Sequence, residues 1–158
     1  MAIRSSGPSW RRESPLSDDS NGGDDRGSVP PETIDREFAQ AEQMLADATT
    51  AHEVDISTAT VVNRLYYACF HAAQAALYAR GFEPRSHGRV GTLLGCELIQ
   101  SGEVPREYGR FLNDMATYRR RVDYGSGGVE RDVEELIDET TEFLEAMRRV
   151  IDEDQSNG

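Results

Sequence analysis

The sequence has no lysine. All 17 basic residues are arginine, and 29 acidic residues outnumber them to give a net charge of -12. Such an excess of hydrated carboxylates is typical of proteins adapted to high salt. The summed charge of the chain repels phosphate, which argues against a general electrostatic attraction to nucleic acid. Any contact with RNA must therefore be local.

Long apolar runs are also missing. No run approaches the roughly 18 apolar residues that a membrane helix needs, and the N-terminal residues form no continuous apolar segment of the signal-peptide type. The sequence therefore predicts a soluble, cytoplasmic protein with no membrane contact. Cys69 and Cys96 lie in apolar stretches without the paired spacing of a metal site, so we expect two reduced thiols in the core.

Recognisable enzyme signatures are absent as well. The sequence contains no zinc-ligand spacing, no nucleophile elbow, no glycine-rich phosphate loop and no dinucleotide fingerprint. Most enzyme classes that carry such signatures are thereby excluded, and we expect neither a metal nor a cofactor. A binding module and a metal-independent nuclease are the classes that remain.

What the sequence does contain is a helical pattern after a polar N-terminal segment. Residues 1–31 are rich in Ser, Gly, Pro and Asp without a regular period, which predicts a disordered tail. Beyond it, apolar residues recur at helical spacing. The predicted helices cover 32–51, a stretch from a cap at Asp55 or Ser57 to a stop at Gly81, 86–99, a stretch from Pro105 to the glycine-rich loop 125–128, and 129–152.

About five helices joined by short loops, with no strand pattern, predict an all-α, up-and-down bundle over residues 32–153, followed by a short tail at 154–158. The second helix is the most apolar and should lie at the centre. Gly91 and Gly95 lower the propensity of the third helix, and close packing would explain them.

The fourth helix has an arginine-rich face opposite its core face. At 100° per residue, Phe111, Met115 and Val122 share the core side. Arginine binds phosphate through a planar fork and stacks on bases, so the opposite face is a candidate site for RNA or a nucleotide. The alternative is that its arginines pair with the acidic residues of 129–152. This face contains Arg106, Arg110, Asn113, Thr117, Arg120, Arg121 and Tyr124.

The second helix carries polar and aromatic residues opposite its apolar stripe. Arg64, Tyr67 and His71 lie there, and such residue types dominate dimer interfaces, so this side is a candidate homodimer surface. His71 is either a general base or a hydrogen-bonded structural residue. His87 begins the third helix, where it either helps to hold an anion or only caps the loop.

Three segments resemble the HEPN domain family: "NRLYYACFHAA", "SHGRVGTLLG" and "YRRRVDYG", in the expected order, with a resemblance that covers about 55–151. HEPN domains are small helical bundles that dimerise. They are often encoded beside a minimal nucleotidyltransferase, and many act as metal-independent RNases in toxin–antitoxin systems. The resemblance implies a homodimer whose fourth helices form one cleft for RNA or a nucleotide, and a cognate nucleotidyltransferase as antitoxin-like partner.

The resemblance also implies site residues. Catalytic HEPN domains carry an arginine followed by a polar residue, then a histidine four to six residues later, and then a tyrosine that can accept a nucleotide from the partner. Arg119, Arg120 and Tyr124 correspond to the arginine, its neighbour and the tyrosine. Asp123 stands near the position of the histidine, and an ionised aspartate does not donate a proton at neutral pH. The expected catalytic residues are thus Arg119, Asp123 and Tyr124.

Two other pairs have the Arg-to-His spacing away from that position. They are Arg64 with His71, on the second helix, and Arg80 with His87, which straddle a helix-breaking Gly and Pro. Arg119 and Asp123 are also spaced for an ion pair along their helix.

Together these features predict a HEPN-type, toxin-like component of a nucleotidyltransferase/HEPN pair that cleaves or binds RNA. The alternative is a non-catalytic nucleotide-binding or protein-interaction module, in which the absent histidine marks lost chemistry.

Overall fold

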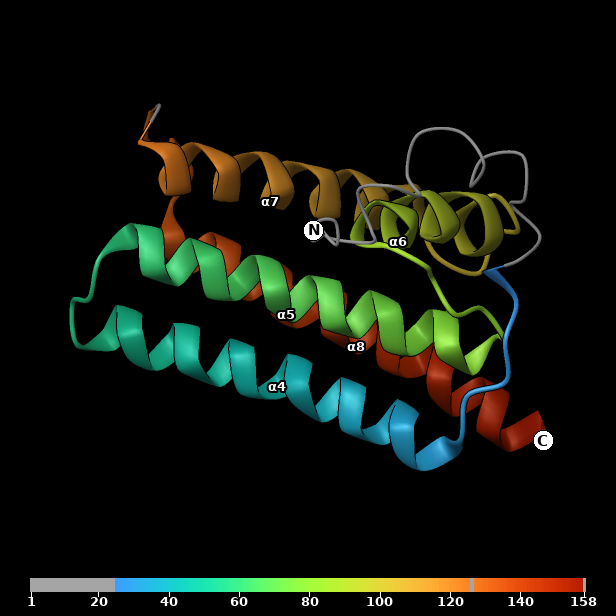
Figure 1. The fold of residues 1–158 in the computed structure, drawn as a ribbon. Helices are drawn as coiled ribbons and strands as arrows, with labels where there is room; N and C mark the ends of the chain where they lie inside the picture. Colours follow the sequence, from blue (N-terminus) through green and yellow to red (C-terminus); the bar gives the residue numbers. More distant parts are fainter. Residues whose placement is uncertain (1–24, 126, 158) are drawn as a thin grey trace, which may run out of the picture.

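The computed structural model describes residues 25–125 and 127–157. No strand occurs in this part of the chain, apart from an isolated bridge between Arg26 and Phe82. The predicted all-α bundle is confirmed. Its helices are α4 (Pro31–Glu53), α5 (Thr58–Ala79), α6 (His87–Leu93), which runs on into the π-helical segment η2 (Leu94–Ile99), α7 (Arg106–Tyr124) and α8 (Val133–Asn157) (Figure 1).

The helix ends follow the local signals in the sequence. The Ser57 side chain caps α5 by accepting a hydrogen bond from the Thr60 amide at 3.2 Å, whereas Asp55 sits in the preceding turn with φ of 62°. Gly81 and Gly125 adopt the left-handed conformation, with φ of 88° and 65°, just after α5 and α7. The last helix begins later than predicted, at Val133, and includes residues 154–157 that we assigned to a tail.

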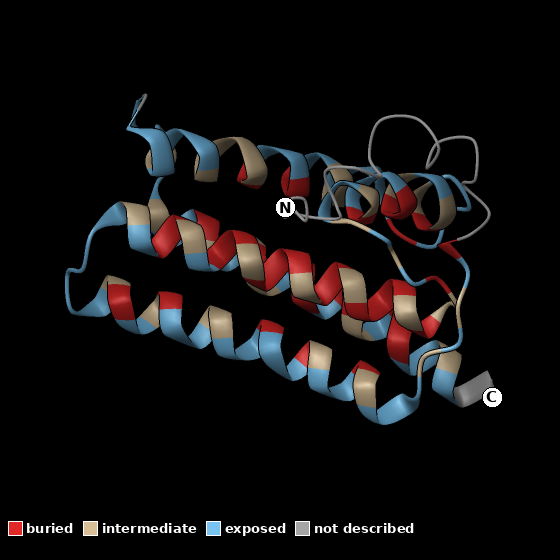
Figure 2. Ribbon diagram, viewed as in Figure 1, coloured by how far each residue is buried: buried red, intermediate tan, exposed pale blue. Residues whose placement is uncertain are grey.

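Helix α5 lies at the centre of the bundle, as predicted. It packs against α4, α7 and α8, with α4 and α7 on opposite sides of it (Figure 1). Figure 2 shows buried residues all along α5, whereas α4 and α7 have broad exposed faces. Short side chains let these neighbours approach closely. The fully buried alanines of α5 are Ala68, Ala72, Ala73, Ala75 and Ala76.

The third helical segment differs from the prediction in two ways. It widens from α to π geometry at Leu94 instead of continuing as one regular helix. The expected close packing at Gly91 and Gly95 is wrong, because a Cβ at either position would meet no atom within 4 Å. The close approach occurs at Gly109 of α7, where a Cβ would lie 2.6 Å from the Cδ1 of Ile99.

Residues 25–30 pack against the connection between α5 and α6, although we expected them to belong to the tail. The carboxylate of Asp25 is buried, accepts a hydrogen bond from the Arg89 Nε at 2.8 Å and another from the Arg85 amide at 3.2 Å. The Gly27 amide bonds to the Gly81 carbonyl at 2.9 Å. These contacts fix the segment that leads to His87. The rest of the predicted N-terminal tail, residues 1–24, lies outside the described residues.

The two cysteines have different environments. Cys69 is buried and donates to the Thr140 hydroxyl at 3.9 Å, and burial raises the pKa of its thiol to about 12. Cys96 is exposed, so its expected place in the core is wrong. In the described part of the chain, no helix is long and apolar enough to cross a membrane.

We expect one of the two thiols to react in the folded protein. The thiolate is the reactive form, and Cys69 is both inaccessible and protonated at neutral pH. Titration with an aromatic disulfide reagent should therefore modify one thiol in the native protein and two after unfolding in guanidinium. Cys96→Ser should leave no native reaction, and a native reaction in that variant would contradict the burial of Cys69.

Candidate functional site

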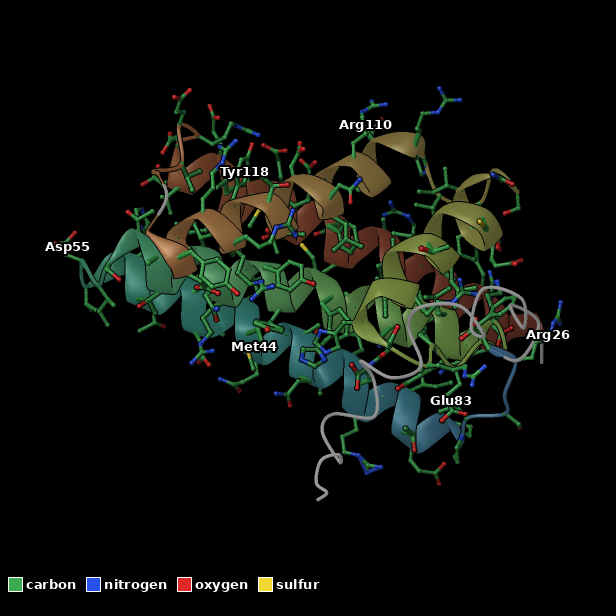
Figure 3. All side chains as sticks on the ribbon, turned by 45° about the horizontal axis from the view of Figure 1, so that its top comes forward. Arg26, Met44, Asp55, Glu83, Arg110 and Tyr118 are labelled. Atoms are coloured by element: carbon green, nitrogen blue, oxygen red, sulfur yellow. The ribbon has the colours of Figure 1, made fainter. Side chains whose placement is uncertain are left out.

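The arginine-rich face of α7 is exposed, as its periodicity predicts. Figure 3 shows Arg110 projecting from α7 into solvent. Arg106, Arg110 and Arg121 form no ion pair within residues 25–125 and 127–157, so the pairing with α8 that we considered as an alternative is not observed. Arg120 donates only to Thr117 on its own helix, at 3.4 Å. The charge of this face is therefore not neutralised by the described part of the bundle.

Arg119 points to α5 instead of joining that exposed face. Its guanidinium carbon lies 5.0 Å from the centre of the Tyr66 ring and 5.7 Å from that of Tyr67, which is the geometry of a cation–π contact. Its Nη1 donates to the Asp123 carboxylate at 3.1 Å, so the ion pair predicted from the four-residue spacing is confirmed. Its Nε is buried and has no hydrogen-bond partner among the described residues.

A cavity of about 270 Å³ lies between α5, α6 and α7, and Arg119 forms part of its wall. Two glycines of α6, Gly88 and Gly91, leave its rim open, since a Cβ at either would meet nothing within 4 Å. The cavity combines an apolar floor with polar groups that converge from two helices, as small-molecule and nucleotide sites do. It is lined by Tyr66, Phe70, His87, Gly88, Val90, Gly91, Leu112, Asn113, Ala116, Arg119 and Arg120.

A larger cavity of about 410 Å³ lies between α4 and α8. Its lining includes Phe38, Leu45 and Leu144, and its single arginine, Arg148, stacks over Phe38 at 5.1 Å. The wall is mostly aliphatic and aromatic, and two carboxylates, Glu42 and Glu145, would repel an anion. The cavity at Arg119 is therefore the better candidate for a phosphate-bearing ligand.

His87 is a site residue whose role the sequence left open, either holding an anion or only capping the loop. Its ring lies 4.2 Å from that of Phe70 at the cavity, beside Arg119 from a different helix. Burial lowers the pKa of His87 below its ordinary value, and the positive charges of His71 and Arg119 lower it further. The imidazole is thus neutral at pH 7. The only sequence signal was its place in "SHGRVG", which does not reveal which arginine it adjoins.

A second imidazole, that of His71, lies next to Phe70 and is held by a carboxylate of α4. The Nδ1 of His71 lies 2.6 Å from the Oε2 of Glu37 on α4, and Gln74 donates to the same oxygen at 2.8 Å. Both interpretations of His71 remain compatible with this contact, because a carboxylate orients structural and catalytic histidines alike.

The remaining predicted residues lie at different distances from the cavity. Tyr124 is 81% exposed at the end of α7 and does not line it. Of the predicted dimer surface, Arg64 is exposed, whereas Tyr67 and His71 are half-buried and adjoin the site. Arg80 is held by Glu103 and by the Val150 carbonyl, at 2.5 and 3.0 Å, away from the cavity.

Comparison with known proteins identifies the family of this all-α domain. Residues 35–150 match the family described as "HEPN domain", and the chain belongs to that family. It is 33% identical to a UPF0332 protein of Thermotoga maritima over 96 residues, which cover 60% of this chain and 73% of that protein. It is 33% identical to a UPF0332 protein of Gloeobacter violaceus over 109 residues, 67% of this chain and 81% of that protein.

Another relative carries a functional name. A protein of Methanocaldococcus jannaschii named "Putative toxin" is 29% identical over 93 residues, which cover 58% of this chain and 69% of that protein. The resemblance inferred from "NRLYYACFHAA" and "YRRRVDYG" is therefore confirmed at the level of the family.

Replacing Arg119 should change the titration of His87. Because the guanidinium lowers the pKa of His87, Arg119→Gln should move that pKa upward, toward the ordinary value of 6.5. The chain has three histidines, so their ring protons can be followed individually by NMR as the pH is varied. Arg110→Gln, on the exposed face of the same helix, is the matched control. A His87 pKa that is the same in wild type and both variants would contradict the described geometry.

Proposed function

We propose that this chain is the toxin-like component of a nucleotidyltransferase/HEPN pair, and that its Arg119 cavity binds RNA and promotes its cleavage. One observation carries the proposal. Arg119 forms part of the cavity wall, its Nε is buried without a hydrogen-bond partner in the described residues, and its Nη1 is held by Asp123. Buried donors normally have an acceptor, and a phosphate oxygen is a strong one for a guanidinium.

The proposed cleavage needs no metal ion because RNA contains its own nucleophile. Attack by a ribose 2′-hydroxyl on the adjacent phosphorus places extra negative charge on the phosphoryl oxygens. A fixed guanidinium at that point stabilises the charge as it develops. Stacking on Tyr66 and Tyr67 and the ion pair with Asp123 hold Arg119 in one orientation, so little reorganisation accompanies the reaction.

A homodimer would join two such sites. The predicted dimer surface of Arg64, Tyr67 and His71 lies on α5 next to the cavity, and Tyr67 itself contacts Arg119. Two copies that meet there would form a continuous cleft. The exposed arginines Arg106, Arg110, Arg120 and Arg121 would then extend it along the path of an RNA backbone.

Tyr124 is proposed as the acceptor for the partner enzyme. A nucleotidyltransferase needs a freely accessible hydroxyl, and Tyr124 is 81% exposed at the end of α7. Co-expression with the nucleotidyltransferase should therefore add the mass of one nucleoside monophosphate to the peptide that contains Tyr124. Tyr124→Phe should abolish the mass change, and Tyr118→Phe, half-buried on the same helix, should retain it. A mass change that persists in Tyr124→Phe would show another acceptor.

A non-catalytic RNA-binding or nucleotide-binding module is the second candidate. It is favoured by Asp123, which stands where catalytic members have a histidine and is already paired with Arg119. In that case the cavity would bind the same phosphate without breaking a bond. The toxin-like RNase would cleave the bound RNA, whereas the binding module would leave it intact.

The first experiment is incubation of purified protein with total RNA, at high salt and with a chelator, read on a gel. Wild type should degrade the RNA, and Arg119→Gln should be slower by about 10²-fold to 10³-fold, as for loss of one charge-stabilising donor. Arg110→Gln is the control for a general charge effect and should lose much less. Intact RNA with wild type, together with binding that depends on Arg119, would instead establish the module.

A further inference from the structure

Two histidines from different helices share one aromatic platform beside the Arg119 cavity. The rings of His71 and His87 both pack against Phe70, with centroid distances of 5.3 and 4.2 Å. Both also adjoin Tyr67, at 6.3 and 6.4 Å. Phe70 and His87 line the cavity, and the ring of His71 contacts that of Phe70 without lining the cavity itself.

The surroundings of His71 fix the orientation of its ring. A carboxylate only accepts hydrogen bonds, so the Nδ1 of His71, 2.6 Å from Glu37, carries the proton in that contact. Glu37 is itself fixed, because Gln74 donates to the same oxygen from the next turn of α5. When the ring is protonated, it forms an ion pair with Glu37, and both side chains are largely buried.

His87 differs from His71 in its electrostatic environment. No ion pair or hydrogen bond to a carboxylate involves it in the described part of the chain. Partial burial lowers its pKa, and the ring of His71 and the guanidinium of Arg119 lower it further. The charged and titratable groups near the two rings come from three helices: Glu37 of α4, Tyr66, Tyr67 and Tyr78 of α5, and Arg119 and Arg120 of α7.

We propose that His87 is the general base and His71, oriented by Glu37, the general acid for RNA cleavage at the Arg119 cavity. They would replace the single histidine that HEPN RNases carry after the arginine. The inference rests on the proposed function, because it assigns proton transfers to the reaction that Arg119 stabilises. Glu37 is a positioning residue.

Cleavage requires one proton to be removed and another to be supplied. The neutral imidazole of His87 takes the proton of a ribose 2′-hydroxyl, and the 2′-oxygen forms a bond to the adjacent phosphorus. The bond between phosphorus and the 5′-oxygen breaks, and that oxygen takes a proton from the imidazolium of His71. The products are a 2′,3′-cyclic phosphate and a 5′-hydroxyl end. Exchange of protons with water restores both rings.

The test that does not depend on cleavage is NMR of the three histidine rings during titration with uridine 3′-monophosphate. The ring signals of both His71 and His87 should shift, and their pKa values should change as the nucleotide binds. His52, paired with Glu134 at the far end of α4, is an internal control and should not shift. Arg119→Gln should weaken the binding. Binding that moves His87 alone, or neither ring, would overturn the inference.

The pH dependence of cleavage of a labelled single-stranded RNA is the second measurement. Wild type should give a bell-shaped profile, because the base must be neutral and the acid protonated. His87→Ala should lose the limb at low pH and His71→Ala the limb at high pH, each with a maximal rate lower by about 10²-fold to 10⁴-fold. His52→Ala is the matched control, and thermal unfolding of each variant checks that it is folded.

Glu37→Gln separates positioning from folding. Glutamine keeps an oxygen that accepts from His71 but removes the charge, so the limb at high pH should shift while the limb at low pH is retained. Unchanged profiles in the histidine variants, with cleavage that still needs Arg119, would refute the two-histidine assignment and leave the proposed function intact. Absence of both cleavage and Arg119-dependent binding in wild type would refute both.

Discussion

The burial of α5 between α4, α7 and α8 is the constraint on which the rest of the structure depends. Fully buried alanines such as Ala72 and Ala76 let three helices approach it at once. Only a narrow strip of α5 therefore reaches solvent, and it carries Tyr67, His71 and Gln74. Polar side chains from α4, α6 and α7 gather along this strip because no other part of α5 is open to them. The candidate site is a consequence of the way in which the core is packed.

The candidate site carries positive charge, whereas the chain as a whole carries a net negative charge. The net charge of -12 repels a phosphate at long range, yet Arg119 and Arg120 place two positive charges in the wall of the cavity. The Debye length falls from about 8 Å at physiological ionic strength to about 3 Å in 1 M salt. In a salt-rich medium, recognition must then rely on direct hydrogen bonds, stacking and burial. The rings of Tyr66 and Tyr67 are suited to this, because a cation–π contact becomes stronger when water is excluded.

Membership of the HEPN family accounts for the fold, but a family does not by itself specify chemistry. Asp123 illustrates the difference. Its position in the sequence suggests a substitute for a histidine, whereas in the structure its carboxylate is engaged by Arg119 and orients it. The imidazoles nearest the cavity, His71 and His87, belong to α5 and α6 and not to the "YRRRVDYG" segment of α7.

The sequence by itself determined the helices, the central place of α5, the exposed arginine face of α7 and the Arg119–Asp123 pair, because these follow from a period of 3.6 residues and from caps such as Ser57. Only the tertiary structure decided that Glu37 meets His71 and that His87 lies beside Arg119. Helical periodicity relates residues within a turn or two of one helix. Contacts between helices depend on how deeply and at what angle the helices pack, which the pattern of a single chain segment does not encode.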